Sequence, residues 1–233
     1  MSALGLMLEA RGIPTVVVGL IRLHMEKVKV PRGLWVPFEL GRPLGEPEDA
    51  AFQTRVLRAA LGLFATARAP STIVDFAEEA PGRLPLPGWR PAVTLAPGLA
   101  LADEIRALAP AQAAHVQRRR RSTVGLTGLA PADWAGHLTA GLSGALPASP
   151  RPGLSPAQLL KFCADDLKAF YSEAAQSDGA RPSSRQVDDW FWNETTAGRT
   201  LQAIRKAALA SDQAGLKAVG GNLIVPGARV VAG

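Results

Sequence analysis

The sequence predicts an α/β protein, with a partial doubly wound parallel sheet in its N-terminal third and a mainly α-helical region after it. Short apolar and β-branched runs alternate with helical patterns over residues 1–68, as in a parallel sheet covered by helices. Proline is dense between residues 70 and 97, which indicates a linker over 69–100. Apolar residues then recur at helical spacing, so 101–233 is expected to be a helical domain.

The first elements alternate between helix and strand. An apolar helix that starts near Leu4 ends at Gly12, because glycine suits a left-handed C-cap. The β-branched run Thr15–Val18 predicts a strand, and residues 20–28 a short helix. Leu34–Phe38 predicts a strand buried on both faces, because its apolar residues are consecutive. An α/β unit normally supplies a strand before its first helix, so the chain is expected to start in mid-unit.

A longer amphipathic helix is expected over residues 50–67, with Glu48 and Asp49 at the positive end of its dipole. Its apolar residues recur at a spacing of three and four, and we expect all of them to pack on the sheet. They are Phe52, Val56, Leu57, Ala60, Leu61 and Phe64. Thr72–Phe76 predicts a further short strand, and the prolines after it predict an irregular, partly polyproline II segment.

Proline, glycine and capping residues divide the helical region. Pro110 is expected to end one helix and start another. Ser155 and Gln158 form a capping box at the start of a long helix. The expected helices are 103–108, 111–121, 130–142, 155–176, one capped by Ser183 or Ser184, and 195–210. Residues 216–231 are glycine-rich and weakly patterned.

Composition excludes several classes of protein. The only cysteine among the 233 residues is Cys163, so there is no intrachain disulfide or cysteine-rich metal site, which is typical of a reducing cytoplasm. No apolar run reaches the roughly 18 residues of a membrane span, and the start lacks the basic region of a signal peptide. His24, His115 and His137 lack metal-ligand spacing. We expect a cytoplasmic protein without a metal, a cofactor or a membrane contact.

One residue and two clusters of residues have alternative interpretations. Cys163 falls on an apolar helix stripe, which favours a buried packing residue over a reactive thiol. Arg118–Arg121 could bind phosphates. However, consecutive helical residues point in different directions, cations suit a helix C-terminus, and no aromatic residues alternate with them, which argues against nucleic acid. Trp190–Trp192 fits a corner of the core between two helices, or alternatively an anchor for a partner.

The loop after the strand 34–38 is the candidate site. Gly41, Pro43, Gly45 and Pro47 alternate with other residues and favour a loop of fixed shape. Ligands of open α/β sheets bind outside the carboxyl ends of the strands, so such a loop can wall a site. The alternative is a simple connection between a strand and a helix. The chain lacks the phosphate-loop, dinucleotide-binding, zinc-protease and hydrolase motifs, so no catalytic residue is assigned.

Three segments resemble the carboxyl end of the selenoprotein B family, the substrate-specific subunits of glycine, betaine, sarcosine and D-proline reductases. They are Gly12-Ile-Pro-Thr-Val16, Val36-Pro-Phe-Glu-Leu-Gly-Arg-Pro-Leu-Gly45, and the helix through Phe52, Leu57 and Leu61. The resemblance covers about residues 4–66, and the loop is its most specific part. It implies reductive cleavage of a small amine or amino-acid-like substrate. The residues that it implies shape the pocket are Pro37, Gly41, Arg42, Pro43 and Gly45. Segments 165–171 and 190–195 resemble a helical extension of uncharacterised relatives.

The resemblance leaves the nucleophile missing. In that family a cysteine or selenocysteine lies just before the helix that leads to Gly-Ile-Pro, which here is upstream of Met1. Cys163 does not match that position. Two hypotheses follow: the coding region extends upstream through an in-frame UGA codon, or the chain is a remnant that pairs with another subunit. We expect a reductase-family protein without its nucleophile, whose partner is another reductase subunit or a second copy.

Two other classes of function remain open from the sequence. The first is a non-catalytic interaction subunit that uses Trp190–Trp192 or Arg118–Arg121. The second, weaker one is a nucleic-acid-binding protein, which would lose affinity steeply with salt. The substrate is not readable from the residues.

Overall fold

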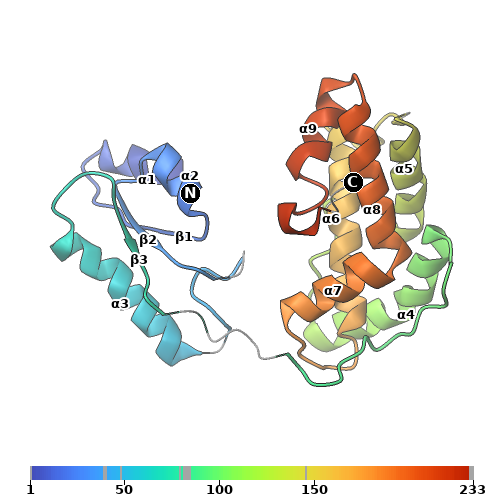
Figure 1. The fold of residues 1–233 in the computed structure, drawn as a ribbon, viewed down its shortest axis with the longest axis horizontal. Helices are drawn as coiled ribbons and strands as arrows, with labels where there is room; N and C mark the ends of the chain where they lie inside the picture. Colours follow the sequence, from blue (N-terminus) through green and yellow to red (C-terminus); the bar gives the residue numbers. More distant parts are fainter. Residues whose placement is uncertain are drawn as a thin grey trace. The chain divides into compact units, whose positions relative to one another are not determined.

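The computed structural model describes residues 2–38, 41–47, 49–78, 80, 85–144 and 146–230. The chain forms two compact units, Met1–Leu84 and Pro85–Gly233 (Figure 1). The predicted fold class is confirmed, since a small parallel sheet with helices comes first and a helical unit follows. The boundary between the units lies within the range 69–100 that the sequence indicated as a linker. Residues 69–84 belong to the first unit, and residues 85–100 belong to the second.

The first unit is a three-stranded parallel sheet with helices. Its elements are α1 (Ser2–Glu9), β1 (Val17–Gly19), α2 (Arg22–Val28), β2 (Arg32–Trp35), α3 (Ala50–Thr66) and β3 (Thr72–Asp75). The strands lie in the order β1-β2-β3, with Leu34 opposite Val18 on one side and Val74 on the other. The strand predicted at 34–38 is therefore the central strand, although its ladder begins two residues earlier.

The two faces of the sheet are covered by different helices (Figure 1). Leu34 and Val36 project towards α3 and pack with Phe52 and Val56. The alternate residues of the strands project to the other face, where Met25 of α2 is buried against Val17. Helix α1 lies against α2. As predicted, β2 is buried on both sides.

One prediction for α3 is wrong. Phe52, Val56 and Ala60 are buried, together with Leu63. Leu57, Leu61 and Phe64, which were expected to face the sheet, are 45%, 61% and 45% exposed. The six apolar residues together cover too wide an arc of the helix, and the sheet contacts only the line through residues 52, 56, 60 and 63. An apolar flank is left at the surface.

The second unit is a bundle of helices around α6. Its elements are α4 (Leu101–Arg119), α5 (Pro131–Ser143), α6 (Pro156–Ala175), α7 (Ser184–Glu194), α8 (Thr196–Ala210), α9 (Ala214–Asn222) and the 3₁₀ turn η1 (Gly227–Arg229). Helix α6 contacts α4, α5, α7 and α9, and its predicted capping box is present, with Ser155 and Gln158 bonded reciprocally. Within the described part of the chain, no helix is long and apolar enough to cross a membrane.

Pro110 does not break the first helix of this unit, contrary to the prediction. Helix α4 continues from Leu101 to Arg119 through an exposed Pro110. Leu108 is buried before the proline. After it, Gln112 donates to Glu173 over 2.8 Å. Contacts on both sides of Pro110 hold the helix together, so tertiary packing offsets the missing hydrogen bond.

The helix predicted at 195–210 is present as α8. Thr195 has an extended backbone, ends α7 and caps α8 by accepting from the Gly198 N–H. The weakly patterned segment 216–231 contains most of α9. Its buried residues Leu216 and Val219 pack into the common core, which supplies the stabilisation that the sequence pattern does not reveal.

The close approach of α8 to α7 gives a testable consequence. A Cβ atom at Gly198 would lie 2.3 Å from the Phe191 carbonyl oxygen, whereas a Cβ at Gly136 of α5 meets nothing within 4 Å. We expect Gly198→Ala to lower the free energy of unfolding by about 1–3 kcal/mol or more. The control Gly136→Ala should raise it by about 0.5–1 kcal/mol, because alanine suits a helix better. Urea unfolding followed by circular dichroism measures both, and equal stability of the two variants would contradict the packing of α7 on α8.

Candidate functional site

The predicted site loop follows β2 at the carboxyl end of the sheet. Val36 continues the ladder by donating to the Gly19 carbonyl over 3.0 Å, and Pro37 is exposed beside the buried Phe38. Gly41 and Gly45 have φ angles of +90° and +85°. Glycine adopts this left-handed region without strain, so the two glycines set the path of the loop. Residues 39, 40 and 48 lie outside the described part of the chain.

The loop is attached to the start of α3. The Gly45 N–H donates to the Arg42 carbonyl over 3.0 Å, and the Arg42 side chain pairs with Glu46. Gln53 of α3 donates to the Glu46 carbonyl over 2.8 Å. These bonds hold the loop against the helix, in agreement with a loop of fixed shape. Pro43 is exposed.

An aromatic cluster lies beneath the loop. The rings of Phe38, Phe52 and Phe76 are 5.4–5.9 Å apart between centroids. Gly45 is buried on this cluster, since a Cβ atom there would lie 2.7 Å from the Phe52 ring. At the carboxyl end of the sheet, the loop therefore packs on aromatic rings, and its two glycines set the path of its backbone. It offers no nucleophile.

A second group of side chains connects the carboxyl ends of all three strands on the opposite face. Arg22, just after β1, bonds to Glu26 over 2.9 Å and to Asp75 at the end of β3. Its guanidinium carbon lies 5.8 Å from the centre of the Trp35 ring at the end of β2. Sequence reasoning missed this group. The available signal was a charged or aromatic residue at the end of each strand.

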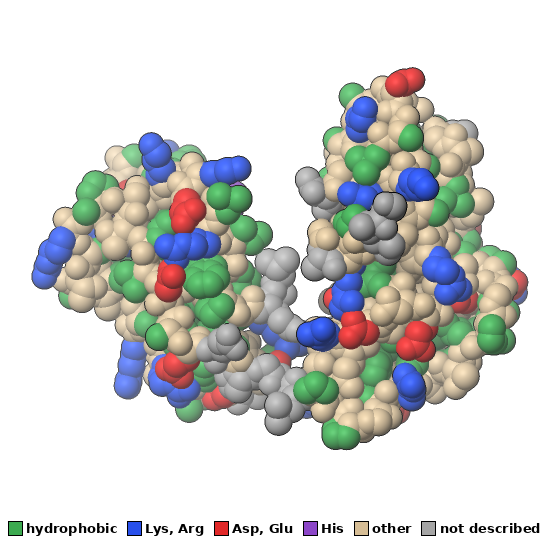
Figure 2. Space-filling model, viewed as in Figure 1, with side chains coloured by type: hydrophobic (Ala, Val, Ile, Leu, Met, Phe, Trp, Pro, Cys, Tyr) green, Lys and Arg blue, Asp and Glu red, His purple; other side chains and the backbone are tan. Residues whose placement is uncertain are grey.

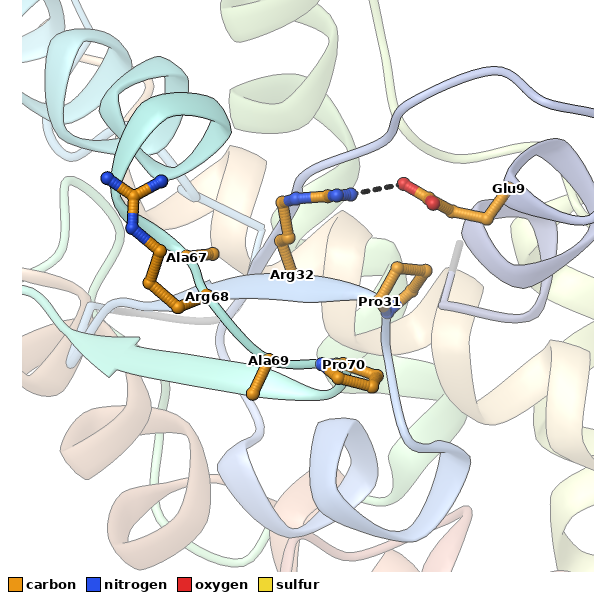
Figure 3. Close-up of a pocket in the computed structure, with 7 residues that line it drawn as sticks. All are labelled: Glu9, Pro31, Arg32, Ala67, Arg68, Ala69 and Pro70. Carbon is orange, nitrogen blue, oxygen red and sulfur yellow. Dashed lines mark hydrogen bonds and ion pairs between the residues drawn. The ribbon is translucent and has the colours of Figure 1, made fainter.

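A pocket of about 330 Å³ lies at the other, amino end of the sheet (Figure 3). Its charged lining residues are Glu9 of α1, Arg32 at the start of β2, and Arg68 after α3. Figure 3 shows the Glu9 carboxylate and the Arg32 guanidinium joined across the pocket. Glu9 also accepts the Thr15 N–H over 2.7 Å. The Glu9 carboxylate and the Arg32 guanidinium are thus paired with each other, and this ion pair connects α1 to the sheet. None of the residues that line the pocket belongs to the predicted loop.

The helical unit contains three buried carboxylates that resemble catalytic groups by burial alone. Glu104, Asp166 and Glu173 are 2%, 0% and 6% exposed. Glu104 accepts from the Tyr171 hydroxyl and from the N–H groups that begin α8. Glu173 accepts from Gln112 and from the segment after α4. Because each carboxylate is saturated with donors, these groups hold loops and helix starts in place.

Asp166 shows this anchoring most clearly. Its two oxygens accept the N–H groups of Gly125, Leu126 and Thr127, each over 2.9 Å, and the Thr127 hydroxyl over 2.7 Å. Burial by itself raises the pKa of this carboxyl, but the four hydrogen bonds to its charged form outweigh burial and lower the pKa. A group of this kind stays ionised and does not serve as an acid near neutral pH.

Cys163 is a packing residue, as predicted. Its side chain lies on α6 and is 0% exposed in the core. Burial together with the nearby charge of Asp166 raises the pKa of the thiol to about 12. A thiol in this state is neither ionised nor accessible, so it is no nucleophile. Within the described residues, no group of three or more His, Cys, Asp or Glu side chains is arranged to hold a metal ion.

The aromatic candidate surface is buried within the helical unit, and the first arginine of the other candidate surface is bonded within it. Trp190, Phe191 and Trp192 are between 4% and 7% exposed. Trp190 and Phe191 pack with Tyr171, and Trp192 packs with Phe191, so the hypothesis that they form a partner surface is wrong and the core corner is confirmed. Arg118 donates to the Gln176 and Ser177 carbonyls after α6. The four arginines are therefore not one free cationic cluster, because the first of them caps a neighbouring helix.

Comparison of the chain with models of known protein families, with curated proteins and with solved structures found no match.

The lowered pKa of Asp166 predicts a pH dependence of stability. A depressed carboxyl pKa contributes stability that is present above the unfolded-state pKa of about 4 and is lost as the pH falls through the folded-state pKa. We expect Asp166→Asn to lower the free energy of unfolding at pH 7 by about 1–3 kcal/mol, because its amide group faces N–H donors. Denaturation at a series of pH values should show this difference shrinking towards pH 3. A constant difference would contradict the role of the charge.

The burial of Cys163 predicts that its thiol is unreactive in the folded chain. We expect the native chain to react with a chromogenic disulfide at pH 8 at least about a hundredfold more slowly than the chain in denaturant, because the thiol is both un-ionised and enclosed. Absorbance of the released thiolate measures both rates. Fast reaction of the folded chain would contradict the packing of α6.

Proposed function

We propose that the first unit is the substrate-binding part of a selenoprotein B-like reductase, which cleaves a C–N bond of a small amine or amino-acid-like substrate. The loop of residues 36–47 carries the proposal. It contains the segment with the most specific resemblance to that family, and it follows the buried central strand at the carboxyl end of the sheet. Ligands of open α/β sheets bind at this end.

In this proposal the loop shapes the pocket and performs no chemistry. The φ angles of Gly41 and Gly45 set its path, and the Phe38, Phe52 and Phe76 rings support it from below. Pro37 and Pro43 are exposed on the loop, where rigid rings limit its motion. Arg42, paired with Glu46, fixes the turn between the two glycines.

The nucleophile of the proposed reaction comes from another polypeptide or segment. Reductive cleavage of this type needs a thiolate or selenolate. The single thiol of these 233 residues is Cys163, which is buried and has a raised pKa. The proposal therefore assigns binding, and not catalysis, to this chain by itself.

A non-catalytic interaction subunit is the second candidate. The observation that favours it is the exposed apolar flank of α3, formed by Leu57, Leu61 and Phe64. Apolar side chains that gather along one side of a helix indicate a contact surface more strongly than scattered ones.

Ligand-observed NMR of the full chain with glycine, sarcosine, betaine and D-proline tests the proposed function. We expect saturation transfer to at least one of these compounds, and a loss of affinity of about tenfold or more in Gly41→Val. Valine does not adopt the φ of +90° at residue 41, while a Cβ there meets nothing within 4 Å, so the loop is distorted without a clash.

Gly88→Val is the matched control, because Gly88 also has a positive φ of +66° and open space but lies in the other unit. Binding should be unchanged in this variant. No binding of any of the four compounds, or equal binding by the wild type and Gly41→Val, would remove the proposal.

A further inference from the structure

The first strand of the sheet has an open edge. Strand β1 pairs with β2 alone among the described residues. The Gly19 carbonyl faces β2, since it accepts the Val36 N–H over 3.0 Å. Backbone groups of successive strand residues point to opposite edges, so both the N–H and the carbonyl of Val18 point away from β2. Neither group has a hydrogen-bond partner within the described part of the chain, and such an edge is a template for another strand.

The exposed flank of α3 lies over the same side of the sheet. Leu57, Leu61 and Phe64 lie on the flank opposite Arg55, and Arg55 pairs with Glu78, just after β3. The Phe64 ring lies 5.9 Å from the Arg32 guanidinium, which reaches Glu9 beside β1. The apolar flank is therefore directed towards β1.

Apolar side chains of β1 and of α3 together form an apolar surface on this side of the first unit. On the α3 face of β1, Val16, Val18 and Leu20 are only partly buried. Leu57, Leu61 and Phe64 continue this surface on the helix. Figure 2 shows apolar side chains at the surface of the first unit. A patch that combines unpaired backbone with apolar side chains suits a partner that supplies both a strand and an apolar layer.

We infer that a second copy of this chain docks on this surface, with the β1 strands of the two copies paired antiparallel about a two-fold axis perpendicular to the sheet. The described residues of the second unit, 85–144 and 146–230, contain no strand that could pair with β1. In the symmetric pair, the two Val18 residues exchange both N–H to carbonyl bonds. This two-fold axis keeps both α3 helices on one face, so their apolar flanks face each other.

The charges of α3 suit this arrangement. Asp49 is the N-cap of the helix, and Arg68 follows its C-terminal end. The apolar side chains Leu57, Leu61 and Phe64 lie between these two charges along the helix. Two antiparallel α3 helices bring the basic end of one towards the acidic end of the other, with their dipoles opposed. Leu57 of one copy then lies near Phe64 of its partner. This inference is independent of the proposed reductase function.

Sedimentation equilibrium of the full chain, wild type and Leu61→Glu, tests the proposal. We expect a concentration-dependent dimer for the wild type. The dimer dissociation constant should be at least about tenfold higher for Leu61→Glu, because each of the two copies then places one glutamate charge in the apolar contact. Leu23→Glu is the matched control. Leu23 is 58% exposed, compared with 61% for Leu61, and it lies on α2 at the other face of the sheet. This control should dimerise like the wild type.

A backbone variant separates strand pairing from helix contacts. Val18→Pro removes the outward N–H, which an edge strand tolerates, so the variant should keep its circular dichroism spectrum and become monomeric. Val18→Cys should be joined into dimers by a short bis-maleimide. The wild type should not be joined, because Cys163 is enclosed.

Three results would each overturn the proposal. The first is a wild-type chain that stays monomeric at all accessible concentrations, which would leave the surface to a different polypeptide. The second is a dimer that persists in both Leu61→Glu and Val18→Pro. The third is equal dissociation of Leu23→Glu and Leu61→Glu.

Discussion

The burial of β2 on both faces is the constraint on which the first unit depends. Leu34 and Val36 face α3, while the alternate positions face Met25 and its neighbours, and strands bond to both edges of β2. A shift of this strand by one residue would move Leu34 and Val36 away from Phe52 and Val56 to the other face of the sheet, where Met25 and its neighbours already pack. The loop that follows it therefore leaves the sheet at a defined point. Gly41, Gly45 and the phenylalanine cluster hold the loop in one shape, which is what a binding wall requires.

In the helical unit, the corresponding constraint is the saturation of buried carboxylates. Glu104, Asp166 and Glu173 lie on α4 and α6, and their partners are N–H and hydroxyl groups of other segments. An unpaired charge at these depths would be strongly destabilising, so the loops that satisfy them are fixed as firmly as the helices. These three carboxylates thus stabilise the fold, and Cys163 beside them is a packing residue. The substrate binding proposed for the protein is confined to the first unit.

Local signals were sufficient to predict much of the fold. The capping box at Ser155, the buried run around Leu34 and the aromatic corner at Trp190 were all predicted from residue type and spacing, and the structure contains each of them. Pro110 shows where such reasoning fails, because contacts of α4 with α6 on both sides of the proline decide the outcome. The group of Arg22, Trp35 and Asp75 was missed because its members are distant in sequence and meet only when the strands align.

By itself, the sequence determined the class of fold, the exclusion of Cys163 from chemistry and the loop at residues 36–47 as the candidate site. These depend on side-chain periodicity and on the backbone preferences of glycine and proline, which are local properties. The tertiary structure decided which side of α3 is buried. Six apolar residues satisfied the helical pattern, but the sheet covers only one line of them and leaves Leu57, Leu61 and Phe64 exposed. The area that one packing surface can cover is not encoded in the spacing of residues along the helix.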